Sequence, residues 1–93
     1  MSFKYDTTKP AGNRVSNILV GGKPLDEKKN YTLATSDFLV SRGGDGYTMF
    51  KDAKILLKAD AAPKDSEVFE HSIKNAPNKT IAPKFEGRIV RIN

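Results

Sequence analysis

The sequence contains no cysteine, no tryptophan and a single histidine among its 93 residues. Without cysteine the chain has no disulfide, no thiol nucleophile and no cysteine-built zinc site. No apolar run reaches the roughly 18 residues of a membrane-spanning helix. The first residues also lack the apolar core of a secretion signal. A chain of this length forms one small domain. We therefore exclude a large enzyme with a deep cleft, and we expect the five Phe and three Tyr to dominate a small core.

The formal net charge is +5, from 16 Lys and Arg against 11 Asp and Glu. A basic protein raises the question of nucleic-acid binding. The cations are nevertheless scattered from Lys4 to Arg91, and Lys28 and Lys29 form the single adjacent pair. This distribution favours a solvated lysine-rich surface over a nucleic-acid interface. It is compatible with a preference for small anionic ligands.

Apolar and polar residues alternate in several short segments, which predicts strands. Residues 3–6 and 14–20 flank a turn rich in proline and glycine, so we expect a hairpin there. Further strands are expected at residues 31–35, 55–57 and 85–92, the second of them buried. In one further segment the apolar residues recur at helical spacing. Residues 66–76 place Val68, Phe69 and Ile73 on one face, with Asp65 as N-cap and Pro77 as the stop. The expected fold is α+β, a mixed sheet with one clear helix.

The segment from Gly43 to Tyr47 reads Gly-Gly-Asp-Gly-Tyr. Glycines permit positive φ and close backbone approach, so we expect a loop of definite shape. It lacks the Lys-Ser/Thr ending of a phosphate-binding P-loop and the alternating acids of a calcium loop. Asp45 is then a carboxylate on a tight turn, able to accept hydrogen bonds from paired hydroxyls such as those of a ribose. The alternative is a plain turn with a solvated or helix-capping aspartate.

Two further side chains have competing interpretations. Phe38 precedes the glycine loop, where its ring could stack on a planar ligand; the alternative is a core phenylalanine. His71 has neither a second histidine nor a cysteine to share a metal ion, so we expect a solvated position on the helix. We therefore expect no metal site and no catalytic residue in this chain.

Several motifs together resemble one family, the C-terminal domain of the 5'-nucleotidases, which also includes UDP-sugar hydrolases and 2',3'-cyclic-nucleotide 2'-phosphodiesterase/3'-nucleotidases. The resemblance covers nearly the whole chain. The motifs that carry it are Tyr5-Asp6, Lys9 to Val15, Pro24-Leu25-Asp26, Tyr31 to Leu39, Gly43 to Tyr47, and Glu86-Gly87-Arg88-Ile89.

The resemblance implies a division of labour between two domains. An N-terminal metallophosphoesterase domain holds two divalent metals, zinc, manganese or similar, and cleaves the phosphate ester. The C-terminal domain binds the nucleoside. Phe38 matches one of two rings that sandwich the base, and Asp45 matches the acid that binds the ribose hydroxyls. Gly43, Gly44 and Gly46 shape that loop. Compared with the loop usual in the family, this chain resembles one with a single extra residue at positions 41–42.

The resemblance further implies that residues 1–93 are the C-terminal part of the substrate-binding domain, an incomplete domain. The second ring, the phosphate-binding arginines and the metal domain are then missing, and this chain alone is inactive. Its partners are a nucleotide and the missing domain, and we expect marginal stability or self-association. The parent protein is expected to be periplasmic, secreted or at the cell surface. The alternative is a stand-alone basic module that binds protein or nucleic acid.

Overall fold

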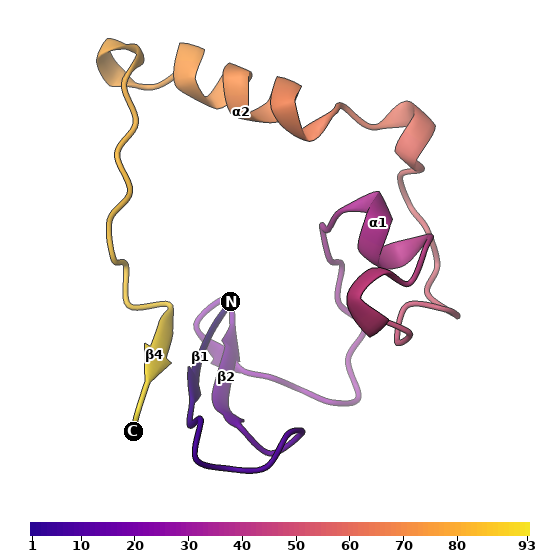
Figure 1. Cartoon of the computed structure of the whole chain (residues 1–93), viewed down its shortest axis with the longest axis vertical. Coiled ribbons are helices and arrows are strands. Elements are labelled where there is room, and N and C mark those ends of the chain that lie inside the picture. The colour runs from indigo at the N-terminus through magenta and orange to yellow at the C-terminus, as the bar shows by residue number, and fades with distance from the viewer. The chain divides into compact units, whose positions relative to one another are not determined.

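A computed structural model describes all 93 residues of the chain. The chain divides into two units, which are described separately. Unit 1 comprises residues 1–30 and 82–93, and unit 2 comprises residues 31–81. Strands are confined to unit 1, and the α-helices and 3₁₀ turns lie in unit 2 (Figure 1). The α+β class with a mixed sheet and one clear helix is confirmed.

Unit 1 is a four-stranded sheet with the strand order β3-β2-β1-β4. Its strands are β1 (Ser2–Tyr5), β2 (Val15–Val20), β3 (Lys23–Pro24) and β4 (Ile89–Arg91). Strand β2 pairs antiparallel with both β1 and β3, whereas β4 pairs parallel with β1. The predicted hairpin of β1 and β2 is confirmed. The sheet is mixed because the last strand of the chain pairs parallel with the first.

An aspartate organises the hairpin turn. The Asp6 carboxylate accepts hydrogen bonds from the Thr8 hydroxyl at 2.6 Å and from the Thr8 backbone N–H at 2.9 Å. Aspartate favours turns because its side chain can hydrogen-bond the backbone two residues further on, as it does here. The two bonds favour the charged carboxylate, the hydroxyl bond most strongly, and so lower the pKa of Asp6 below its ordinary value of 3.8.

The C-terminal strand is shorter than predicted. Expected over residues 85–92, it is found as β4 at Ile89–Arg91. Gly87 adopts a left-handed φ of 74°, which is incompatible with a continuous strand. At the end of the chain the Asn93 side chain holds Thr7, accepting from its N–H at 2.9 Å and donating to its hydroxyl at 2.8 Å. These bonds join the two chain segments that make up unit 1.

Unit 2 contains no strand, so two strand predictions are wrong. Residues 31–35 have no regular structure, and residues 55–57 form an irregular bend. Ile55, Leu56 and Leu57 are 51%, 69% and 63% exposed, where the sequence predicted burial. Their composition favours strands, but strand propensity takes effect only when a neighbouring strand pairs with the backbone. Unit 2 supplies no such neighbour.

The helical elements of unit 2 are α1 (Asp37–Val40), α2 (Asp65–Lys74) and three 3₁₀ turns: η1 (Gly44–Gly46), η2 (Ala59–Ala61) and η3 (Pro77–Lys79). Helix α2 confirms the long helix of the sequence analysis, with shifted ends. Asp65 is its first residue, and Lys64 rather than Asp65 is the N-cap. The Glu67 carboxylate accepts a hydrogen bond from the Lys64 backbone N–H at 3.0 Å, as in a capping box.

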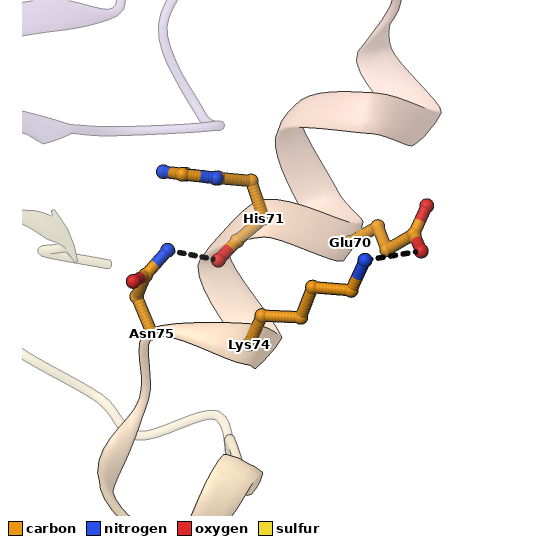
Figure 2. Close-up of polar contacts among 4 residues, drawn as sticks. All are labelled: Glu70, His71, Lys74 and Asn75. Carbon is orange, nitrogen blue, oxygen red and sulfur yellow. Dashed lines mark hydrogen bonds and ion pairs between the residues drawn. The ribbon is translucent and has the colours of Figure 1, made fainter.

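The last turn of α2 ends before the predicted residue 76. The His71 carbonyl accepts two hydrogen bonds from Asn75, from its backbone N–H at 3.1 Å and from its side-chain Nδ2 at 2.8 Å (Figure 2). These bonds satisfy a carbonyl that the helix end would otherwise leave unpaired. One residue earlier along the helix, Lys74 and Glu70 form an exposed ion pair of 3.0 Å. Exposed pairs at this helical spacing contribute about 0.3–0.5 kcal/mol.

The chain buries no hydrophobic side chain, so the expected aromatic core is absent. Eighteen large apolar side chains are exposed, and Gly44 is the one residue in the buried class. Phe85 is fully exposed, and Val68 and Phe69 on the apolar face of α2 are 53% and 59% exposed. No helix has the length and apolar character needed to cross a membrane.

Candidate functional site

The candidate site is built on a single helical turn followed by a glycine loop. Ser36 is extended and precedes α1 as its N-cap. The turn closes through the Ser41 N–H, which donates to the Asp37 carbonyl at 2.8 Å. Helix α1 and the 3₁₀ turn η1 are in contact, both drawn in magenta in Figure 1. Residues 38 and 44 therefore belong to one local structure.

The glycine loop requires left-handed backbone at three positions. Gly43 has φ 60° and ψ 31°, Asp45 has φ 55° and ψ 25°, and Gly46 has φ 76°. Glycine adopts this region without steric cost, and aspartate tolerates it better than most residues. The Tyr47 N–H donates to the Gly44 carbonyl at 3.1 Å and closes the turn. The predicted loop of definite shape is confirmed.

The loop brings Gly44 directly against the ring of Phe38. A Cβ placed on Gly44 would overlap the Cδ1, Cε1 and Cζ atoms of that ring. Gly44 is buried by this contact, while Phe38 remains 51% exposed. Of the two alternatives for Phe38, the structure disfavours a core residue. Its stacking on a ligand stays a prediction.

Asp45 presents its side chain to solvent. Its carboxylate makes no hydrogen bond and no ion pair within the chain. The neighbouring cation, Arg42, places its Nε 4.0 Å from the Asp37 carboxylate, and both side chains are in contact with solvent. Such a long, exposed ion pair contributes little. The Asp45 carboxylate is therefore available to accept hydrogen bonds from a ligand, which is what binding to paired hydroxyls requires.

An aromatic pair next to the loop was missed by the sequence analysis. The rings of Tyr47 and Phe50 stack with their centroids 6.5 Å apart and their planes 10° from parallel. Their spacing of three residues was the available signal, since such residues meet across one turn of chain. The pair lies at the exit of the loop that carries Asp45.

His71 lies on the solvent side of α2, as predicted. Its imidazole points away from the Glu70–Lys74 ion pair in Figure 2. Nowhere in the chain do three or more His, Asp or Glu side chains gather in a group that could hold a metal ion.

Comparison with known proteins identifies the family. The family model for the 5'-nucleotidase C-terminal domain matches residues 1–52, a range that contains Phe38 and the whole glycine loop. The trifunctional nucleotide phosphoesterase protein YfkN of Bacillus subtilis is 31% identical over 97 aligned residues, covering 99% of this chain and 6% of YfkN. Bovine 5'-nucleotidase is 37% identical, covering 91% of this chain and 15% of that protein.

A third relative is the cell wall protein Lmo0130 of Listeria monocytogenes, 38% identical over 74% of this chain and 8% of that protein. The chain thus spans between 6% and 15% of the length of these three relatives. No solved structure matches it. Because the family model covers more than half of the residues, this chain belongs to the 5'-nucleotidase C-terminal domain family.

Proposed function

We propose that the chain is the nucleotide-recognition part of a 5'-nucleotidase-like phosphoesterase, which dephosphorylates nucleotides in nucleotide catabolism. The observation that carries the proposal is one local structure holding both a half-exposed ring, Phe38, and an unpaired carboxylate, Asp45. Both residues lie within the range matched by the family model.

Each residue has a distinct role in this proposal. The exposed part of the Phe38 ring stacks on the base, an interaction that contributes about 1–3 kcal/mol per base. The Asp45 carboxylate accepts hydrogen bonds from the two ribose hydroxyls, and bonds to a charged acceptor are roughly twice as strong as neutral ones. Gly43 and Gly46 provide the left-handed backbone that presents Asp45 at the tip of the turn.

Cleavage of the phosphate ester belongs, in this proposal, to a separate metallophosphoesterase domain that holds two divalent metals. The residues of this chain do not fit such a centre, because no group of three donor side chains is present. We therefore assign no metal and no catalytic step to this chain. A periplasmic, secreted or cell-surface location of the parent protein is supported by a relative named as a cell wall protein.

We propose further that residues 1–93 are one part of the substrate-binding domain. The eighteen exposed large apolar side chains support this, because a soluble monomer rarely leaves so much apolar surface uncovered. In the parent protein, the rest of that domain would cover those other than Phe38, whose exposed surface is left to the ligand.

The test is a titration of the isotopically labelled chain, followed by two-dimensional NMR. Adding AMP is expected to shift the signals of residues 37–47, whereas ribose 5-phosphate, which has no base, is expected to shift them much less. Equal effects of the two ligands, or none, would refute the proposal. The alternative of a basic module predicts instead that an oligonucleotide shifts signals of lysines and arginines throughout the chain.

A further inference from the structure

We propose that Gly44 is a positioning residue for Phe38: its missing side chain leaves room for the aromatic ring and fixes which face of that ring meets a ligand. The inference rests on the proposed nucleotide site and extends it. Gly44 touches no ligand in this account and acts only through Phe38.

The geometry identifies the covered face of the ring. A Cβ on Gly44 would lie almost equally close to Cδ1, Cε1 and Cζ, three consecutive atoms of the Phe38 ring. An atom in the ring plane beyond Cε1 would be much farther from the two neighbouring carbons than from Cε1 itself. The Gly44 Cα therefore directs its missing substituent at a face of the ring. That face is covered, and the opposite face is available for stacking.

The three glycines of the loop serve two different physical purposes. Gly43 and Gly46 are left-handed, and a Cβ on either would meet nothing nearer than the Tyr47 carbonyl oxygen, at 3.8 Å from Gly43. Glycine is required at these two positions because of their backbone conformation. Gly44 does not have positive φ, so its requirement is space. Only at Gly44 would a methyl group collide with another side chain.

The position of Gly44 in the chain gives this contact its functional meaning. Gly44 immediately precedes Asp45, so the backing of the ring and the carboxylate come from adjacent residues. A nucleoside also keeps its two recognition groups at a nearly constant separation, since the base is bonded directly to the ribose. Holding the ring on Gly44 therefore matches the spacing of the stacking face and the carboxylate to one ligand. Displacing the ring breaks that match even when both side chains remain.

The experiment substitutes Gly44→Ala in the 93-residue chain and measures binding of AMP and ribose 5-phosphate by NMR titration. Loss of correct stacking is expected to weaken AMP binding by about 5- to 100-fold, with little change for ribose 5-phosphate. Gly22→Ala is the control for a glycine substitution outside the site. At φ 78° the alanine strains the backbone of unit 1, but nothing lies within 4 Å of the added Cβ and the candidate site is in unit 2, so AMP binding is expected to stay unchanged.

A double-mutant cycle separates positioning from general damage to the loop. In a Phe38→Ala background the added methyl group has no ring to displace, so Gly44→Ala is expected to cause no additional loss of AMP binding. A loss of the same size in both backgrounds would overturn the inference. So would an unchanged affinity of the single variant Gly44→Ala for AMP.

A second measurement tests the contact without any ligand. Protons over an aromatic face are shielded, so the Gly44 Hα signals are expected upfield in the wild-type chain and at ordinary positions in Phe38→Ala. Ordinary Gly44 shifts in the wild type would overturn the inference even if Gly44→Ala fails to fold. Wild-type chain that does not bind AMP would refute the proposed function and this inference together. AMP binding that Gly44→Ala leaves intact would refute the inference alone.

Discussion

Replacing Phe38 by alanine separates the contribution of this ring to stability from its contribution to ligand binding. A fully buried phenylalanine costs about 3–5 kcal/mol when truncated to alanine. Phe38 is 51% exposed, so about half of that contact is available to lose. We expect the free energy of unfolding to fall by about 1.5–2.5 kcal/mol.

We expect the loss of AMP affinity in Phe38→Ala to be independent of its loss of folding stability. Removing a ring stacked on a base costs about 1–3 kcal/mol, and each 1.4 kcal/mol corresponds to a factor of about ten in affinity. Phe38→Ala should therefore raise the dissociation constant for AMP by about 5- to 150-fold. The dissociation constant for ribose 5-phosphate should barely change, because that ligand has no base to stack.

Phe85→Ala is the matched control for this substitution. Phe85 is fully exposed and lies in unit 1, so its removal is expected to change neither stability nor AMP binding. Denaturant unfolding followed by circular dichroism gives the stabilities, and NMR titration gives the affinities. Three results would refute the reasoning: unchanged AMP binding by Phe38→Ala, equal losses for both ligands, or the same loss in Phe85→Ala.

Four further outcomes are expected. Asp45→Ala should weaken binding of AMP more than of 2'-deoxy-AMP, because only the ribonucleotide offers both hydroxyls; equal losses in calorimetry would contradict the assigned role. The purified chain should not hydrolyse AMP, cyclic AMP or a chromogenic phosphate ester with added Mn²⁺ or Zn²⁺, since no three donor side chains gather in it; metal-dependent turnover that co-purifies with the chain would contradict this. The chain should self-associate through its eighteen exposed large apolar side chains; a compact monomer at all concentrations in sedimentation, with a high melting temperature, would argue against it. Thr8→Val should raise the pKa of Asp6 toward 3.8 by removing the hydroxyl bond. Because that pKa is lowered by folding, the stability it contributes is present above pH 3.8 and is lost as pH falls through the folded-state pKa, which an NMR titration of the Asp6 carboxyl measures.

Local chemistry made several elements predictable from residue order. The hairpin follows from two alternating segments around a proline- and glycine-rich turn, and α2 follows from helical spacing that ends before Pro77. The left-handed loop follows from glycines at positions 43 and 46. In each case the determining interactions lie within a few residues along the chain, so no knowledge of distant neighbours is needed.

Elements that depend on distant partners were not predictable in this way. Residues 31–35 and 55–57 have strand-forming composition, yet no strand lies beside them in unit 2 and they form none. Strand β4 pairs with β1 from the opposite end of the chain, a partner that local residue order does not indicate.

The features of the candidate site also fall into those that the local sequence predicts and those that depend on tertiary contacts. Sequence alone singled out Phe38 and Asp45 as residue types suited to a base and a ribose, and it indicated a glycine-shaped turn between them. It could not distinguish a core ring from an exposed one, nor assign different purposes to neighbouring glycines. Those answers required the fold of the loop back onto α1, because burial and steric overlap are properties of atoms brought together in space.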